Sequence, residues 1–277
     1  FNLSYSVDNN EKLIFRGHKI NSLTGSVWAL RKLANNIPYI HDLGYKRNYS
    51  ELLISDKLNN GGLVIMCGET GQGKSTTAAS SIIYRLKEYG SFCLTIEDPV
   101  EMPLQGQYPA KNGGQGICYQ TTAGEDEIDN AIKGALRSYP SVSNSILFLG
   151  EIRTSAMANE VLRIAANGHL VFTTMHGIDL LSSVERFVQM ASSHKTTQKE
   201  EVLSMLSLVF RLAIHQKLNT NKVSGKKVLD ARVLFSSNGL SGVANKIKSG
   251  EIKQLGTYIE QQNLILQRGE SILKHDY

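Results

Sequence analysis

The stretch Gly68-Glu69-Thr70-Gly71-Gln72-Gly73-Lys74-Ser75 decides the fold class of this chain. It matches the pattern G-x-x-x-x-G-K-[ST] and directly follows the apolar run 63–67. From Lys74 to Tyr89 the composition is helix-like, and Gly90 stands where a C-terminal cap is expected. An apolar run of this length is typical of a parallel strand covered on both faces. The order of strand, glycine loop and helix predicts an α/β fold.

The residue types in this loop suit the binding of phosphate. Glycines allow successive backbone N–H groups to converge on phosphate oxygens at the positive end of a helix dipole. We expect Lys74 to neutralise the β- and γ-phosphates and Ser75 to ligate Mg²⁺. An ordinary glycine turn would not explain the strand before it and the helix after it. The expected cofactors are ATP and Mg²⁺, and the expected nucleotide-binding residues are Gly68, Glu69, Thr70, Gly71, Gln72, Gly73, Lys74, Ser75 and Thr76.

Three further apolar runs extend the pattern. Residues 92–96, 146–149 and 170–172 are candidate buried strands separated by helical or loop segments, which predicts a parallel α/β sheet. The prolines and glycines between 99 and 116 indicate a long surface loop. From residue 183 onward the chain is expected to be mainly helical.

Acidic residues follow two of these strands. Glu151 ends the run 146–149 and is the candidate general base, which would orient or deprotonate the attacking water, or hold Mg²⁺ through a water. The alternative for Glu151 is a surface carboxylate paired with Arg153. Glu97 and Glu101 follow the run 92–96, at the strand end where α/β proteins bind ligands.

Histidines and cysteines give little sign of a metal site. His169 and His176 flank a short strand, but no cysteine or third ligand stands at a spacing that supports a zinc site. Cys67, Cys93 and Cys118 are far apart and form no C-x-x-C pair, which argues against structural zinc and against a disulfide framework. A reducing compartment fits this cysteine usage best.

Length and composition limit the class of protein. At 277 residues the chain favours two domains, and 41% apolar residues suffice for a buried core. Thirty Lys and Arg against 25 Asp and Glu give a net charge of +5, which suits a solvated basic surface or contact with phosphates. No run approaches about 18 apolar residues and no leader-like segment opens the chain, so we expect a soluble protein. Because Phe1 opens it, the first domain is treated as incomplete.

Apolar residues alternate from residue 1 to about 33, which predicts an antiparallel hairpin and a further strand. Asn35, Asn36 and Pro38 break this pattern and place a domain boundary near residues 36–50.

With these stretches in order, the chain resembles the secretion and type IV pilus ATPase superfamily of hexameric motors. Residues 68–75 are similar to its Walker A motif, 95–101 to its Asp box, 149–153 to its Walker B motif and 168–176 to its His box. The resemblance implies a RecA-like P-loop ATPase domain with a helical C-terminal region over 46–277. Residues 1–45 are similar to the end of a smaller PAS-like α+β domain and its linker.

The resemblance also implies roles for basic residues. Arg16, Arg31 and Arg137 fall on family arginines and are candidate arginine fingers, against the alternative of solvent-exposed or salt-bridging arginines. His169 and His176 would sense or relay nucleotide state between subunits. Together with Glu97, Glu101 and Glu151, these histidines form the candidate catalytic set.

As a member of this superfamily the chain would form a homo-oligomer, most readily a hexamer. It would be cytoplasmic and associated peripherally with the inner membrane through a platform protein of a pilus or secretion system. The four-cysteine zinc domain typical of assembly and type II secretion motors is missing, which favours the retraction-like branch. Residues 243–250 share the spacing of a retraction motif, but Ala244 replaces an arginine. In the Walker A-like stretch, Gln72 stands where the family usually has serine. Gly177, which follows His176, stands where the family usually has threonine.

Three alternatives stay open at this point. A type IVB or conjugative secretion ATPase has the same general shape. A nucleic-acid translocase shares the scaffold and the basic pI, although no stripe of Lys and Arg with interleaved aromatic residues stands out, so no nucleic-acid partner is expected. The third alternative is a nucleotide-binding regulator without appreciable turnover.

Overall fold

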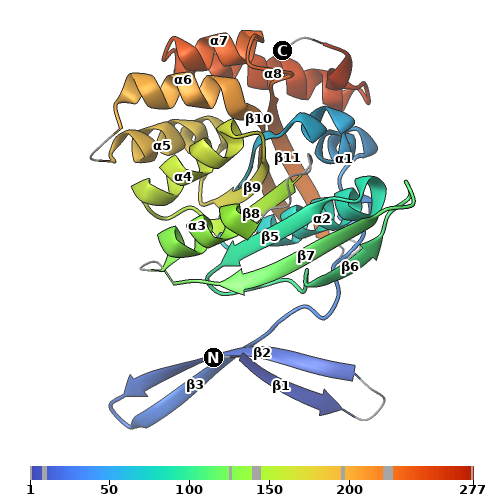
Figure 1. The fold of residues 1–277 in the computed structure, drawn as a ribbon, viewed down its shortest axis with the longest axis vertical. Helices are drawn as coiled ribbons and strands as arrows, with labels where there is room; N and C mark the ends of the chain where they lie inside the picture. The colour runs from blue at the N-terminus through green and yellow to red at the C-terminus, as the bar shows by residue number, and fades with distance from the viewer. Residues whose placement is uncertain are drawn as a thin grey trace.

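The computed structural model describes residues 2–7, 11–124, 127–138, 145–194, 197–220, 227–275 and 277. An eight-stranded sheet with helices on both faces forms the core, and a separate three-stranded sheet lies beyond one end of it (Figure 1). The mixed α/β core with a central parallel sheet is the fold class that the order of strand, glycine loop and helix predicts.

The core sheet has the strand order β11-β10-β4-β9-β8-β5-β7-β6. The six strands from β10 to β7 run parallel, and β11 and β6 are antiparallel edges. The strands are β4 (Gly62–Cys67), β5 (Phe92–Glu97), β6 (Gly106–Pro109), β7 (Gln115–Thr122), β8 (Ser145–Glu151), β9 (Leu170–Met175), β10 (Phe210–Thr220) and β11 (Lys227–Phe235).

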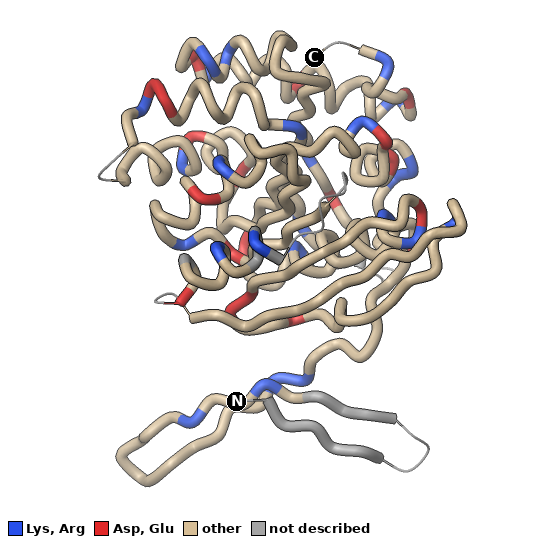
Figure 2. Tube along the Cα trace, in the orientation of Figure 1, with Lys and Arg blue, Asp and Glu red and all other residues tan. Residues whose placement is uncertain are grey.

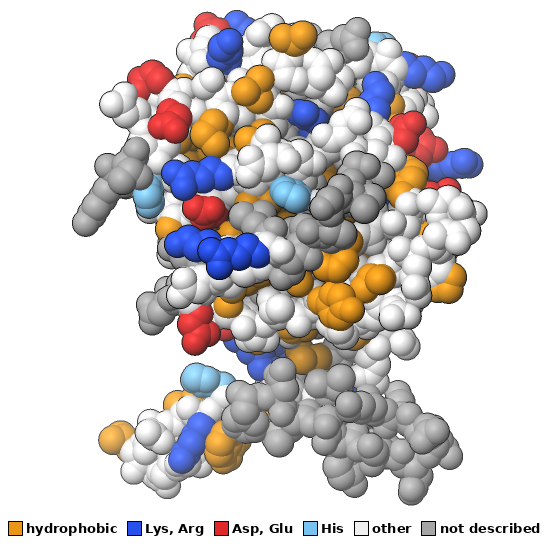
Figure 3. All heavy atoms as spheres, viewed as in Figure 1, with side chains coloured by type: hydrophobic (Ala, Val, Ile, Leu, Met, Phe, Trp, Pro, Cys, Tyr) orange, Lys and Arg blue, Asp and Glu red, His pale blue; other side chains and the backbone are white. Residues whose placement is uncertain are grey.

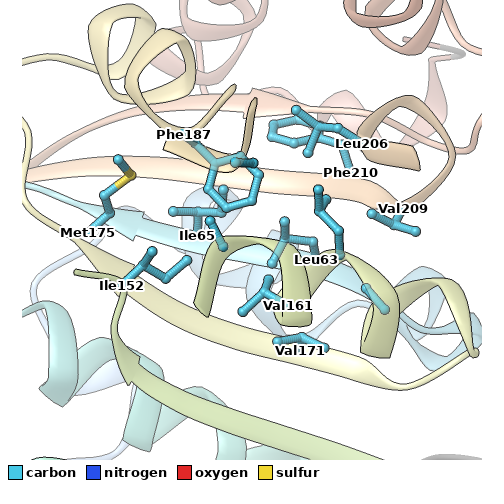
Figure 4. Packing of buried hydrophobic residues seen from close by; sticks show 14 of the residues in the cluster. Leu63, Ile65, Ile152, Val161, Val171, Met175, Phe187, Leu206, Val209 and Phe210 are labelled. Carbon is cyan, nitrogen blue, oxygen red and sulfur yellow. The ribbon is translucent and has the colours of Figure 1, made fainter. Parts of the chain in front are cut away.

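Two apolar layers cover the faces of this sheet. Side chains alternate along β4, so Leu63 and Ile65 join one cluster while Val64 and Met66 join the other. Figure 4 shows the first cluster, in which Leu63 and Ile65 lie with residues of α4, α5 and α6. Helices α1 and α2 pack on the second. The α-helices are α1 (Arg47–Ile54), α2 (Lys74–Tyr89), α3 (Ile128–Ser138), α4 (Ser155–Ala166), α5 (Leu180–Ser192), α6 (Lys199–Val209), α7 (Gly242–Lys248) and α8 (Leu255–Gln267).

One expectation from the sequence is incomplete and another is wrong. Helices predominate from residue 183 as expected, but β10 and β11, which the sequence did not predict, follow α6 and extend the sheet beyond β4. The segment 99–116 is not one long loop, since it holds β6 and the start of β7. Its glycines do mark a turn, with Gly113 at φ +81°, but the turn joins two short strands at the sheet edge. In both places pairing with neighbouring strands outweighs the local sequence signal.

The smaller sheet consists of β1 (Asn2–Val7), β2 (Glu11–Ser22) and β3 (Gly25–Lys32), all antiparallel. In Figure 2 basic positions gather where this sheet meets the chain that leads to the core, and a further one lies farther out on the sheet. Exposed apolar side chains of β2, β3 and the turn between them, seen in part in Figure 3, are those of Ile20, Leu23, Val27, Trp28 and Leu30. The division of the chain at residue 45 stays a prediction.

Over the described residues, none of the helices combines the length and apolarity needed to cross a membrane.

Candidate nucleotide-binding site

The phosphate-binding loop joins the end of β4 to the start of α2. Gly68, Gly71 and Gly73 have φ values of +147°, +79° and +81°, which residues other than glycine rarely adopt. At Gly68 a Cβ would lie only 2.6 Å from the carbonyl oxygen of Gln216. The loop therefore needs glycine here for both its backbone conformation and its close contact with β10.

Lys74 is folded back into the loop and is 9% exposed. Its Nζ donates hydrogen bonds of 2.8 Å to the carbonyl oxygens of both Gly68 and Glu69. Burial lowers the pKa of Lys74, and the carboxylates of Glu151 and Glu101 act in the opposite direction. The ammonium group is thus held at the mouth of the loop by acceptors that a phosphate would replace.

Glu97 and Glu101 lie at the carboxyl end of β5, beside the loop. Glu97 is 4% exposed and accepts a hydrogen bond of 3.0 Å from Nε2 of Gln120, and burial raises its pKa. Oε2 of Glu101 accepts a hydrogen bond of 2.8 Å from the hydroxyl of Ser75. Glu101 therefore holds the hydroxyl that the sequence assigns to Mg²⁺.

Glu151 ends β8 and lines a cavity of about 390 Å³ whose wall also includes Lys74 and Ser75. Its Oε2 lies 3.2 Å from Nε and from Nη2 of Arg153, and Nη1 of Arg153 lies 4.0 Å from Asp98. The surface pair considered for Glu151 is therefore formed, yet the carboxylate still lines the cavity. In this geometry Glu151 is both paired with Arg153 and placed where a general base would act.

Two of the three candidate arginines reach this cavity from the smaller sheet. Arg16 on β2 and Arg31 on β3 are directly opposed in the antiparallel register, and Nη1 of Arg31 lies 3.9 Å from Oε1 of Glu101. Both arginines line this same cavity of about 390 Å³, together with Lys74 and Glu151. Arg137 is exposed in the last turn of α3 and is not among the described residues that line this cavity.

The two histidines lie at opposite ends of β9. His176 follows the carboxyl end of β9, and its carbonyl accepts a hydrogen bond of 3.1 Å from Arg186. His169 precedes the strand, bonds to the hydroxyl of Ser145, and has its pKa lowered by burial. Six strand residues span roughly 20 Å. The structure therefore does not bring His169 to the nucleotide cavity of its own chain.

No cluster of three or more His, Cys, Asp or Glu side chains suited to a metal occurs in the described parts of the chain. The donor set does fit Mg²⁺, which prefers few protein oxygens and keeps several waters. The Ser75 hydroxyl and the Glu101 carboxylate are already within hydrogen-bond distance, and Glu151 lines the same cavity. Ser75 would hold the ion directly and Glu151 through a water.

Two residues of the site escape sequence reasoning. The hydroxyl of Tyr45 donates a hydrogen bond of 2.7 Å to Oε1 of Gln216, whose Nε2 donates one of 2.6 Å to the carbonyl of Gln72. Gln216 lies on β10, a strand that the sequence did not predict. Recognising the apolar run 212–214 as a buried strand would have placed Gln216 near its carboxyl end, on the edge where the loop lies.

Comparison with known proteins identifies the family to which this chain is similar. A model of the type II/IV secretion system protein family matches residues 2–265. The chain is 31% identical over 259 residues to the uncharacterised protein YggR of Escherichia coli strain K12, which covers 93% of this chain and 73% of YggR. It is 29% identical over 246 residues to the type IV pilus retraction ATPase PilT of Pseudomonas aeruginosa, covering 89% of this chain and 66% of PilT, just under two thirds.

A solved structure gives the same fold. The crystal structure of the pilus retraction motor PilT with bound ADP matches 98% of this chain and 74% of that chain, with a TM-score of 0.75 and 28% identity.

Proposed function

We propose that this chain, which belongs to the family of type II/IV secretion system proteins, is an ATP-hydrolysing motor of type IV pilus retraction or of a related secretion apparatus. One observation carries the proposal. Arginines of the smaller sheet and acidic residues of the core line the same cavity as the phosphate-binding loop. Such a cavity joins the chemistry of hydrolysis to the relative position of two parts of the chain.

In the proposed reaction each residue has a defined task. Backbone N–H groups of the loop bind phosphate oxygens, and Lys74 turns from the carbonyls of Gly68 and Glu69 to the β- and γ-phosphates. When bound, Mg²⁺ neutralises phosphate charge. Glu151 orients or deprotonates the attacking water, because its carboxylate lies at the carboxyl end of β8 on the cavity wall.

Movement arises from an exchange of partners at Glu101. In this structure Glu101 accepts from the Ser75 hydroxyl and lies 3.9 Å from Arg31. A bound nucleotide competes for both partners, since Ser75 is needed for Mg²⁺ and the guanidinium is drawn to the γ-phosphate. The smaller sheet, which carries Arg31, would therefore shift when the nucleotide binds and return after hydrolysis.

Assembly and partners are proposed from the relatives. The chain would act as a homo-oligomer, most readily a hexamer, that engages an inner-membrane platform protein from the cytoplasmic side. The named functions of the relatives, which include a type IV pilus retraction ATPase, support a role at such a platform. The proposed part for His176 is to relay nucleotide state between subunits. His169 would do so only toward a neighbouring subunit.

The test combines kinetics and genetics. We expect Mg²⁺-dependent phosphate release from ATP that neither single- nor double-stranded DNA changes. Stimulation by DNA would favour a translocase, and negligible turnover with intact nucleotide binding would favour a regulator. In the source organism, deletion of the gene is expected to give excess surface pili. Unchanged pili with loss of substrate transfer would instead identify a secretion ATPase of the type IVB or conjugative kind.

A further inference from the structure

The back of the phosphate-binding loop rests on the carboxyl end of β10. This strand runs past the last residue of β4, because Cys67 pairs with His215 and β10 continues to Thr220. Beyond His215 the edge of β10 that pairs with β4 faces the loop instead of a strand, while its other edge stays paired with β11. The backbone N–H of Leu218 there donates a hydrogen bond of 2.6 Å to Oε1 of Gln72.

Gln216, also on β10, binds the backbone of Gln72, whose side chain is bound by Leu218. Its side-chain Nε2 donates to the carbonyl of Gln72, and the residue is 1% exposed. A Cβ on Gly68 would meet the backbone of Gln216, and one on Gly73 would lie 3.3 Å from its Nε2. Gln216 thus lies against both ends of the loop, on the side away from the phosphate cavity. Satisfying a loop carbonyl from behind leaves the loop N–H groups free to face a phosphate.

The orientation of the Gln216 amide depends on Tyr45. The Tyr45 hydroxyl donates to Oε1 of Gln216, which fixes the amide so that its Nε2 points toward Gln72. The same hydroxyl lies 3.5 Å from Oγ1 of Thr77 on α2. Tyr45 belongs to the segment between β3 and α1, the segment that connects the arginine-bearing sheet to the core. A continuous chain of hydrogen bonds therefore joins this segment to the loop.

We propose that Gln216 is a positioning residue for the phosphate-binding loop, and that Tyr45 sets its orientation according to the position of the connecting segment. The proposal rests on the proposed nucleotide site but adds a regulatory contact behind it. Movement of the connecting segment that withdraws the Tyr45 hydroxyl releases the Gln216 amide and loosens the loop. Nucleotide affinity would then depend on the position of the smaller sheet through this contact as well as through the arginines that line the cavity.

The test compares two Tyr→Phe variants. Tyr45→Phe removes the hydroxyl that orients Gln216. Tyr89→Phe is the matched control. Tyr89 lies at the end of α2 far from the loop, and its partly buried hydroxyl donates one hydrogen bond of 3.0 Å to the carbonyl of Ile54. Affinity is measured by titrating each full-length variant with the fluorescent N-methylanthraniloyl-ADP and Mg²⁺, and melting temperature is measured in parallel.

We expect Tyr45→Phe to weaken binding of this probe about fivefold, the effect of one net hydrogen bond, while Tyr89→Phe leaves affinity within about twofold. In a Gln216→Met background, which itself weakens binding, Tyr45→Phe should have no further effect. The proposal is overturned if Tyr45→Phe and Tyr89→Phe lose affinity equally, or if Tyr45→Phe leaves affinity unchanged. It is also overturned if the losses caused by Tyr45→Phe and Gln216→Met add in the double variant. Absence of binding by the unmodified chain would overturn the nucleotide site itself.

Discussion

Glu151→Gln separates the two roles that the structure allows for this carboxylate. The change keeps the size of the side chain and removes its charge and basicity. As a partner of Arg153, Glu151 contributes little to stability, because the two side chains are 35% and 46% exposed and exposed pairs contribute at most about 1 kcal/mol. Arg153 also keeps Asp98 at 4.0 Å. The expected fall in melting temperature is therefore no more than about 4 °C.

As the general base, the same group has a much larger effect. Loss of a positioned base lowers kcat by about 10²- to 10⁴-fold, or roughly 2.7–5.4 kcal/mol of barrier. Affinity for ATP should be unchanged or increased, because a negative charge is removed beside the phosphates. Steady-state phosphate release, nucleotide titration and thermal melting measure the three quantities separately.

Glu160→Gln is the matched control. Glu160 forms a comparable exposed pair at 3.3 Å with Arg163 on α4, and it is not among the described residues that line the nucleotide cavity. We expect the control to retain full kcat. If Glu151→Gln keeps more than about a tenth of the original kcat, or if both variants lose activity in parallel with stability, Glu151 is not the base.

Three further predictions concern the loop, the acidic residues and the arginines. Gly68→Ala should weaken ADP binding at least about tenfold and lower the melting temperature, because its Cβ would lie 2.6 Å from the backbone oxygen of Gln216 at a φ of +147°; normal binding would contradict the tight packing. Glu97→Gln should raise the melting temperature at pH 7, because burial raises the pKa of Glu97 and makes its charged form costly. The sign follows from the raised pKa: the unmodified protein loses stability as the pH rises from about 4.5 through the pKa of the folded state, so the gain should vanish near pH 4, and a gain that persists there would point to another cause. Arg31→Ala should lower kcat at least about tenfold with little change in melting temperature, because its contact with Glu101 is exposed and 3.9 Å long; phosphate release at the unmodified rate would remove Arg31 from the reaction.

The parts of the fold that the sequence predicts are those with strong local signals. The run 63–67 is apolar at every position and buried on both faces, so β4 and the helix after the loop were found with their bounds nearly correct. β10 and β11 were missed because their strand character depends on pairing. Lys217 and Asn219 are ordinary polar residues, and they lie in a strand because β11 provides their partners, Asp230 and Val228.

The site follows the same division. Lys74 and Ser75 were located by the spacing of a motif and Glu151 by its place after an apolar run, and the structure places all three on one cavity. Spacing could not show that Glu101 holds the Ser75 hydroxyl, or that His169 lies at the far end of β9. These facts depend on how strand ends align across the sheet, which is set by tertiary packing.

The direct opposition of Arg16 and Arg31 in the smaller sheet has a thermodynamic consequence. Opposed residues of an antiparallel pair point to the same face, and two like charges there destabilise the sheet, by roughly 0.2–1 kcal/mol. If the phosphates of the nucleotide bind between them, as proposed above, this repulsion becomes a shared attraction. Nucleotide binding and the stability of the β2–β3 hairpin would then be linked, and each would favour the other by the same factor. Loss of the γ-phosphate would restore part of the repulsion, so the stability of the hairpin would differ between the ATP-bound and ADP-bound states.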